Sequence, residues 1–252
     1  MQPSKQLPGT WGRRLISAAL ILGLWQLATL FFPPLVVPPI SKVLLRLWEI
    51  VTGESFLPTV LRTLWRLATG LGIGITLGSL LGLLCGLSRA AEDILLPMVS
   101  VFQSVPPVCW VVMALVWFGF NGKPCIFIVA TATIPTMVIN LCHGVRGIDP
   151  ELLEMARLYR FSRGKTLRHV VLPSVRPYFQ SALEIVISGG WKLVVMGEVL
   201  TTSTGIGGAI TTARLNIEPD AIIAWALLLV IFCFATQKLL KLLLCQRRDA
   251  VC

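Results

Sequence analysis

The sequence has few charged residues, and this shortage is the first constraint on what kind of protein it can be. Only 13% of its 252 residues are Asp, Glu, Lys or Arg, whereas 55% are hydrophobic. Soluble domains carry about 25% charged residues, so the composition excludes an ordinary soluble domain. Apolar runs of about 20 residues predict instead a chain that lies in a lipid bilayer.

Patterns that several kinds of chemistry require are also missing. The seven cysteines form no CxxC pair, which favours small buried side chains over a metal or redox site. His143 and His169 each lack a second ligand three or four residues away, so they predict neither a metal site nor catalysis. The net charge of +10 is not a basic stripe with interleaved aromatics, so we expect no nucleic-acid partner.

Two glycine-containing segments look like fragments of nucleotide-binding motifs, and both are incomplete. Gly164-Lys165-Thr166 ends like a phosphate-binding loop, but Tyr159 stands where that loop needs its first glycine. The segment 204–208 has no Lys followed by Ser or Thr, and it predicts a turn in an outer loop. We therefore expect this chain to bind no cofactor.

Six segments are long and apolar enough to cross a bilayer, and they predict an all-α protein with six transmembrane helices in one domain over residues 1–252. A span needs about 20 mostly apolar residues. The first segment is longer than the apolar part of a signal peptide and lacks a cleavage site, so we interpret it as an uncleaved helix. The segments are roughly 14–32, 60–87, 93–118, 124–145, 177–200 and 220–244. Between the first two, residues 40–51 predict an amphipathic helix that lies on the outer membrane surface or on neighbouring spans.

The distribution of basic residues predicts the orientation of these spans. If both termini are cytoplasmic, 15 of the 22 Lys and Arg residues lie on the cytoplasmic side, six on the other side and Lys192 within a span. An excess of Lys and Arg marks the cytoplasmic side of membrane proteins. We therefore expect a multi-pass protein of a prokaryotic inner membrane, with both termini in the cytoplasm.

Glycine recurs at every fourth position of the second span. Such a spacing aligns the glycines along one ridge of a helix, where they allow another helix to approach closely. Tight internal packing and a surface along which helices slide are both consistent with this pattern. The packing glycines are Gly70, Gly74, Gly78, Gly82 and Gly86.

The third span contains Pro106-Pro107 directly after Gln103 and Ser104. Pro107 cannot donate a backbone hydrogen bond, and it disfavours a helical conformation at Pro106. Irregular backbone inside a bilayer has to line a cavity or be buried in protein. We therefore expect these four residues to contribute to a substrate pathway; a kink that serves only packing is the alternative.

The fifth span contains charged residues that a bilayer does not accept freely. Glu184, Lys192 and Glu198 all lie within it, and each charge at mid-bilayer costs about 2.5–3.5 kcal/mol on insertion scales. Such residues face protein or water. We expect Lys192 and Glu198 to lie on the substrate pathway, with structural ion pairing as the alternative.

A polar, basic stretch at 146–176 interrupts the apolar chain. Its sequence predicts two helical runs, one starting after Asp149-Pro150 and one after a turn near Phe161-Ser162, with Leu172-Pro173 closing the second. A loop between two membrane helices needs no such organisation. We therefore expect a partner protein to bind it.

The order of residues in this loop resembles the EAA loop of permease subunits of binding-protein-dependent ABC importers. That pattern is Glu-Ala-Ala, three residues, Gly, about nine residues and then Ile-x-Leu-Pro. Glu154-Met155-Ala156 and 170–173 match it, while Met155 replaces an alanine and Arg160 replaces the glycine of the turn. Further matching pieces over almost the whole chain point to the nitrate/sulfonate/taurine group.

The resemblance implies a type I importer permease that carries a small anion, works as a homodimer, and contacts two ABC ATPase subunits and an extracytoplasmic binding protein. ATP and Mg would be bound by the ATPases and not by this chain, which would then be no enzyme. The residues expected to dock the ATPase are Glu151, Glu154, Met155, Ala156, Arg157, Arg160, Gly164, Leu172 and Pro173. In this interpretation Ala156 lets the partner approach closely.

Two other functions stay open at the level of the sequence. An ion-coupled secondary transporter would show internal symmetry, with carboxylates in corresponding helices, whereas the carboxylates here concentrate in one span. A membrane-embedded enzyme acting on lipid headgroups would need an acid/base or metal constellation, and the sequence offers none.

Overall fold

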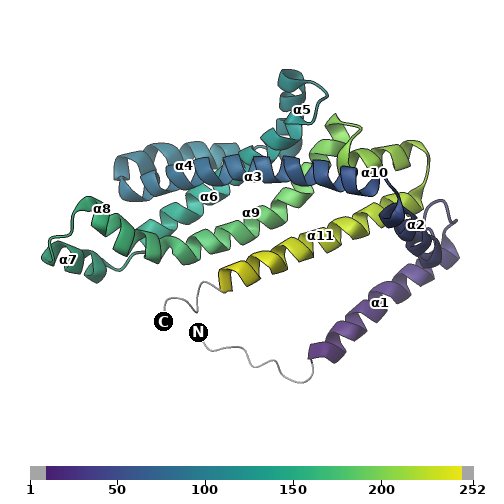
Figure 1. Cartoon of the computed structure of the whole chain (residues 1–252), viewed down its shortest axis with the longest axis horizontal. Helices are drawn as coiled ribbons and strands as arrows, with labels where there is room; N and C mark the ends of the chain where they lie inside the picture. Colours follow the sequence, from purple (N-terminus) through teal and green to yellow (C-terminus); the bar gives the residue numbers. More distant parts are fainter. Residues whose placement is uncertain (1–9, 246–252) are drawn as a thin grey trace.

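Figure 1 shows a computed structural model of the chain, in which residues 10–245 are described. All secondary structure in this part of the chain is helical. Lys5, Arg247 and Arg248, three residues of the predicted cytoplasmic set, lie outside it. In chain order the helices are α1 (Thr10–Phe31), α2 (Ile40–Thr52), α3 (Phe56–Leu87), α4 (Arg89–Ser104), α5 (Pro107–Phe118), α6 (Lys123–Arg146), α7 (Pro150–Leu158), α8 (Arg163–Thr166), the π-helix η1 (Leu167–Val171), α9 (Leu172–Thr201), α10 (Gly205–Leu215) and α11 (Pro219–Cys245).

Three of the described helices are long and apolar enough to cross a membrane on their own: α3, α6 and α11. A fourth span results if α4 and α5 count as one broken segment. In α1, only the shorter stretch Leu22–Phe31 qualifies as an apolar helix among the described residues. Each predicted span therefore corresponds to a helix or to a pair of helices, and length and composition identify three or four of them as membrane spans.

The seam between α3 and α6 forms the centre of the molecule. The five predicted packing glycines of α3 lie against α6, where side chains also recur at every fourth residue: Val129, Thr133, Met137, Leu141 and Val145. A Cβ atom added at Gly78 would lie 2.6 Å from the Cβ of Met137. Since no real Cβ contact is that short, the two helices approach as closely as their backbones allow.

The remaining core forms where α9 packs against α6 and α11. Trp191 of α9 is fully buried, and its ring stacks on Phe232 of α11 with the centroids 5.8 Å apart. The indole N–H of Trp191 donates to the hydroxyl of Thr236 at 3.0 Å, which satisfies its only polar atom. This arrangement fixes one face of α9 against the bundle.

The predicted third span, 93–118, is two helices and not one. α4 and α5 meet at an angle of 91°, and the break lies at Val105 and Pro106, whose backbones are extended. Pro107 begins α5, a position where the missing N–H costs nothing. The proline pair therefore produces a right-angle corner, which Figure 1 shows where α5 turns away from the bundle.

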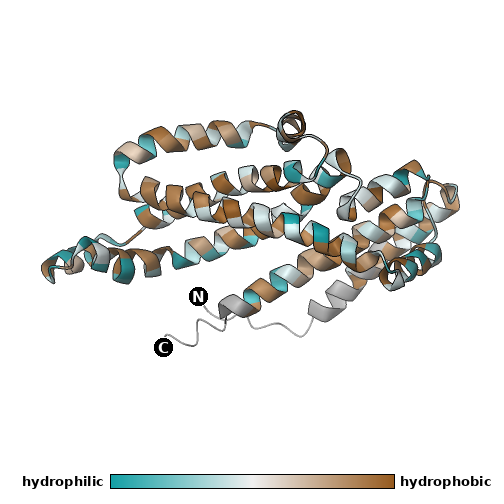
Figure 2. Ribbon diagram, turned by 45° about the horizontal axis from the view of Figure 1, so that its top comes forward, coloured by the Kyte–Doolittle hydropathy of each residue, from teal (hydrophilic) through white to brown (hydrophobic). Residues whose placement is uncertain are grey.

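At the end of the bundle away from the α7–α8 hairpin, the predicted amphipathic helix 40–51 is present as α2. It buries Val43, and Arg46 connects it to the start of α11 through an ion pair of 2.6 Å with Glu218. At the opposite end, Arg146 of α6 and Glu92 of α4 form an ion pair. Figure 2 shows that the α7–α8 end is mostly hydrophilic, whereas apolar residues dominate the long helices.

The predicted closure at Leu172-Pro173 is wrong. No non-helical residue separates α8, η1 and α9, so the second arm of the loop continues directly into the fifth predicted span. The Leu172 N–H donates to the carbonyl of Leu167, five residues back. This π-helical turn shifts the hydrogen-bond register just before Pro173, whose missing N–H therefore does not end the helix.

Candidate functional site

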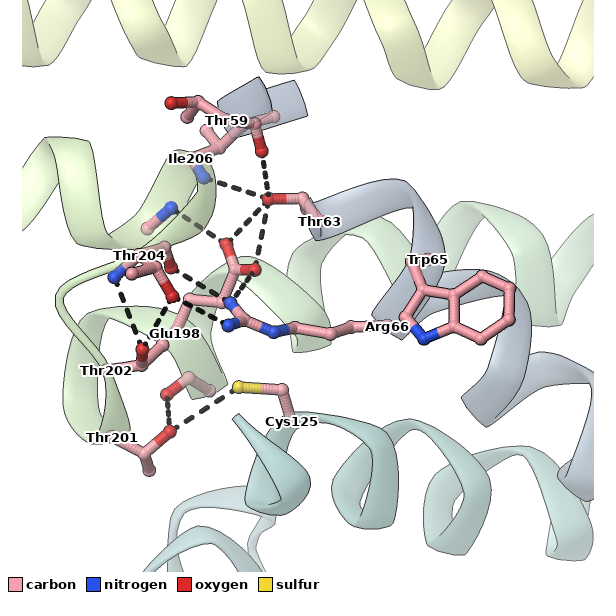
Figure 3. Close-up of polar contacts among 12 residues, drawn as sticks. Thr59, Thr63, Trp65, Arg66, Cys125, Glu198, Thr201, Thr202, Thr204 and Ile206 are labelled. Carbon is pink, nitrogen blue, oxygen red and sulfur yellow. Dashed lines mark hydrogen bonds and ion pairs between the residues drawn. The ribbon is translucent and has the colours of Figure 1, made fainter. Parts of the chain in front are cut away.

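A fully buried carboxylate lies where the last turn of α9 meets the start of α10 and the N-terminal part of α3. Glu198, on the last turn of α9, has no exposed surface. Arg66 of α3 donates to it at 2.6 Å, and the Gly207 N–H of α10 donates to its second oxygen at 2.9 Å. Figure 3 shows these groups converging on the carboxylate. A buried charge is tolerated only with such partners.

The hydroxyl of Thr63 completes this set of contacts, to which we refer as the Glu198 cluster. Thr63 Oγ1 lies 3.0 and 2.9 Å from the two carboxylate oxygens of Glu198. It also accepts a hydrogen bond of 2.8 Å from the Ile206 N–H. Arg66 donates further to the carbonyl and the hydroxyl of Thr204, at 2.9 and 2.7 Å. The cluster therefore joins three helices through charge-assisted hydrogen bonds.

The start of α10 is part of this cluster and not the turn in an outer loop that the sequence predicts for 204–208. Residues 205–208 are all buried. Gly205 has φ +88°, and a Cβ atom there would collide with the Glu198 carboxylate. A Cβ atom at Gly207 would lie 2.5 Å from the Val195 carbonyl oxygen. The glycines are required here because the backbone of α10 lies directly on α9.

A cavity of about 250 Å³ lies at the corner between α4 and α5 and is bordered by α6 and α9. Gln103 and Pro107, two of the predicted pathway residues, line it. Its other lining residues are Phe102, Val105, Trp110, Ile128, Thr131, Ala132, Thr133, Pro135, Thr136, Ile185, Val186, Gly189, Gly190 and Leu193. The cavity is thus formed where the proline pair breaks the helix.

Neither Lys192 nor Glu198 is among the residues that line this cavity, although Leu193, next to Lys192 on α9, does line it. On α9, Lys192 follows Gly189 by three residues and Ile185 by seven, so the three positions share one helix face. The Lys192 side chain is exposed in the single chain. Glu198 is enclosed in its own cluster, and Ser104 donates to the Ser100 carbonyl at 2.8 Å.

In the loop 146–176, the backbone turns at Arg160 as a glycine would. Arg160 has φ 51°. Its N–H donates to the Arg157 carbonyl at 3.0 Å, and the Phe161 N–H donates to the Ala156 carbonyl at 2.9 Å. This pair of bonds is the Schellman motif, which usually has glycine at the left-handed position. The hairpin therefore keeps its geometry although arginine replaces glycine.

The two faces of α7 differ in exposure. Ala156 is 4% exposed, so its side chain is packed within this chain and does not lie on an open face of α7. On the other side, Met155 is 55% and Leu158 is 84% exposed. The remaining residues of the predicted docking set are exposed: Glu151, Glu154, Arg157, Arg160, Gly164, Leu172 and Pro173.

A family model described as the binding-protein-dependent transport system inner membrane component matches residues 74–244. The chain belongs to this family of ABC importer permeases. The permease is therefore a membrane-embedded transport subunit and not an enzyme. By the description of its family, it works in a transport system that depends on a binding protein.

Relatives of the permease are named as transport permeases for aliphatic sulfonates, taurine and bicarbonate. It is 32% identical to the putative aliphatic sulfonates transport permease protein SsuC of Escherichia coli, over 82% of this chain and 81% of that protein. It is 27% identical to the taurine transport system permease protein TauC of the same organism, over 92% and 86%. The bicarbonate transport system permease protein CmpB of Synechococcus elongatus is 33% identical over 64% and 59%.

Solved structures confirm the fold. The permease resembles a chain of the MetNI methionine ABC transporter in an inward-facing conformation, with a TM-score of 0.57 and 18% identity over 75% of this chain and 98% of that one. It also resembles a chain of a bacterial alginate ABC transporter in complex with a periplasmic protein that carries an alginate pentasaccharide. There the TM-score is 0.61 and the identity 16%, over 93% and 95%.

Sequence reasoning found some members of the permease's sites and missed others. It placed Glu198 correctly in a helix, and it missed Arg66 and Thr63, which lie 132 and 135 positions earlier. The sequence did contain one signal for such a partner, because a buried Glu requires a basic residue beside it. Which of the 22 Lys and Arg residues pairs with Glu198 can be identified only from the fold.

Proposed function

We propose that the permease forms, as a homodimer, the pathway through which an ABC importer moves a small anion of the nitrate, sulfonate or taurine type across the inner membrane of a prokaryotic cell. The names of its relatives support this class of cargo: an aliphatic sulfonate, taurine and bicarbonate permease. A binding protein on the outer side delivers the cargo. Two ATPase subunits bind ATP and Mg, and this chain binds no cofactor.

In this proposal six spans cross the bilayer, with both termini in the cytoplasm. α1 and α9 complete the set formed by α3, α4 with α5, α6 and α11. α9 has 30 residues, enough to cross a bilayer, and its low hydropathy has a cause: it carries charges that face water or other protein. The excess of Lys and Arg on one side supports the orientation.

The substrate pathway in this proposal passes the corner between α4 and α5. Gln103, Ser104, Pro106 and Pro107 belong to the corner, and Lys192 faces the same space. A lysine on an exposed face of a membrane helix is expensive in lipid, which supports an aqueous surface there. Glu198 holds the outer end of α9 in place beside this pathway and does not form its wall.

The observation that carries the coupling role is the exposed apolar face of α7 on a well-formed hairpin. Met155, Leu158 and Tyr159 are large, apolar or aromatic and exposed, and no membrane span contains them. An amphipathic helix seated in a groove of a partner is a common mode of recognition. In this proposal, closure of the ATPase pair moves α7. Because α8 and η1 are continuous with α9, this movement is transmitted to α9.

Substitution of Met155 by Asp tests this role. A carboxylate buried against a partner groove without a counter-charge costs several kcal/mol, so Met155→Asp should abolish co-purification of the ATPase and ATP-driven uptake. The matched control is Leu215→Asp, a change of the same kind at a 73% exposed leucine of α10 at the outer end. If Met155→Asp retains the ATPase as well as Leu215→Asp does, the docking proposal is wrong.

A further inference from the structure

We propose that the cavity at the α4–α5 corner is a cargo-binding site that selects one class of anion: a monoanion whose charged group is attached to an apolar body. Selectivity would then lie in the permease itself as well as in the binding protein. This inference rests on the proposed function, because it requires that cargo crosses the membrane beside this cavity. Three properties of the cavity lead to it.

The first property is an apolar wall with aromatic rings. Trp110 and Phe102 stack with their ring centroids 5.2 Å apart, and both line the cavity. Ile128, Val186 and Leu193 extend the apolar surface across α6 and α9. Burial of an alkyl or aryl group against such a wall contributes favourably to the free energy of binding. Nitrate and bicarbonate have no apolar surface to bury, so they receive no such contribution.

The second property is a small set of neutral hydrogen-bond donors. The Gln103 amide and the Thr131 hydroxyl make no hydrogen bond to any other described residue, and both line the cavity. Thr136 contributes a hydroxyl whose only contact, to the Ala132 carbonyl, is weak at 3.4 Å. These groups can donate to the oxygens of one anionic group without first losing a strong bond.

The third property is the sign and position of charge. None of the described residues that line the cavity is charged, and Lys192 stands on the helix face that carries Gly189 and Ile185. A Cβ atom at Gly189 would have nothing within 4 Å, so the α9 surface one turn before Lys192 is open beside the cavity. One cation without an acidic neighbour suits a monoanion. The ammonium group of a zwitterion such as taurine would find no carboxylate in the cavity.

Equilibrium binding to the complete transporter tests this inference. Permease and ATPase are purified together in lipid nanodiscs, and binding of radiolabelled 1-pentanesulfonate is measured by dialysis with unlabelled pentanesulfonate, taurine or nitrate as competitor. We expect saturable binding that pentanesulfonate displaces at least tenfold more effectively than taurine or nitrate does. Lys192→Met should weaken binding at least tenfold, whereas Lys192→Arg should stay within about threefold of the wild type.

Two further variants separate the site from general effects of mutation. Trp110→Ala should weaken pentanesulfonate binding about tenfold through the lost apolar wall. Lys241→Met is the matched control, since Lys241 is exposed on α11, pairs with Glu184 at 3.6 Å and does not line the cavity. It should bind like the wild type. Retention of the ATPase on size-exclusion chromatography verifies that each variant is folded.

Any one of three results overturns the inference. These are the absence of saturable binding, competition by taurine or nitrate as effective as that by pentanesulfonate, and unchanged binding of pentanesulfonate to the Lys192→Met variant. ATP-driven uptake in proteoliposomes, measured in parallel, distinguishes this failure from failure of the proposed function. If uptake requires the ATPase but is unchanged by substitution of Lys192, the cargo-site inference is wrong and the proposed function stands. If uptake proceeds without ATP, both the inference and the proposed function are wrong.

Discussion

The two ends of the permease are built on opposite principles. At one end, the Glu198 cluster buries a charged group and supplies its partners from within the chain, from α3, α9 and α10. At the other end, the α7–α8 hairpin satisfies its backbone with the turn at Arg160 but leaves apolar side chains such as Leu158 exposed. The first end is satisfied by contacts within the chain, and the second presents the exposed apolar surface that we propose as the docking site of a partner.

This contrast teaches where each kind of mutation should act. A change in the Glu198 cluster removes an internal contact, so it should lower the free energy of unfolding of the chain. A change on the exposed face of the hairpin removes nothing that holds the chain together, so it should affect assembly with the ATPase. The three predictions that follow test this division, starting with the largest effect.

Removing the cation of the Glu198 cluster should have the largest effect on stability. Arg66→Met leaves the buried carboxylate without its counter-charge, which costs about 3–5 kcal/mol. Its control, Arg62→Met, changes an exposed arginine one turn earlier on α3 and should cost less than about 0.5 kcal/mol. Denaturant unfolding of the detergent-solubilised transporter measures both. Equal effects of the two variants would show that the cluster contributes nothing special.

Substitution in the seam between α3 and α6 should have the second largest effect on stability. Gly78→Ala pushes a methyl group into Met137 and should destabilise the chain by about 1–3 kcal/mol, as overpacking does. Gly72→Ala, on the same helix, meets nothing within 4 Å and should be neutral or stabilising by about 0.5–1 kcal/mol, since alanine favours helix. The difference between their unfolding midpoints is the measurement. If Gly72→Ala were the more damaging variant, the seam would not determine the packing of α3.

The smallest effect concerns the left-handed turn of the hairpin. Arg160→Gly removes the cost of a left-handed conformation at a non-glycine residue and should stabilise the turn by about 1 kcal/mol. Hydrogen exchange at the Phe161 amide should then be slower by roughly fivefold. Ile217, with φ 59°, ends α10 in the same way, so Ile217→Gly should slow exchange at the Glu218 amide. Faster exchange in either variant would contradict this account of the turn.

Much of this fold follows from local patterns in the sequence. The glycine spacing predicts the close seam on α3 because a period of four along a helix is a local property. The proline pair predicts a break near residue 106, and the residues before Arg160 predict the first arm of the hairpin. Each of these depends on backbone geometry within a few residues, and each is present in the structure.

What the sequence could not provide are the consequences of packing. Nothing near Pro106 indicates a corner of 91°, because the angle depends on how α4 and α5 rest on α6. Leu172-Pro173 looked like a helix end, and the π-helical turn of η1 kept the helix intact. Thr204–Gly208 has the composition of a flexible turn, yet the Glu198 carboxylate under its glycines makes it a buried helix start. Long-range partners decide all three cases.

The continuity of α9 with the hairpin gives the permease a lever. α9 has 30 residues, which corresponds to roughly 45 Å at 1.5 Å per residue. If α9 tilted by about 10° around the end that joins the hairpin, its far end would move by roughly 8 Å on this length. The Glu198 cluster stands at that far end and ties it to α3 and α10. A small rotation at the hairpin therefore becomes a displacement of several ångströms at the other end of α9, shared by three helices at once.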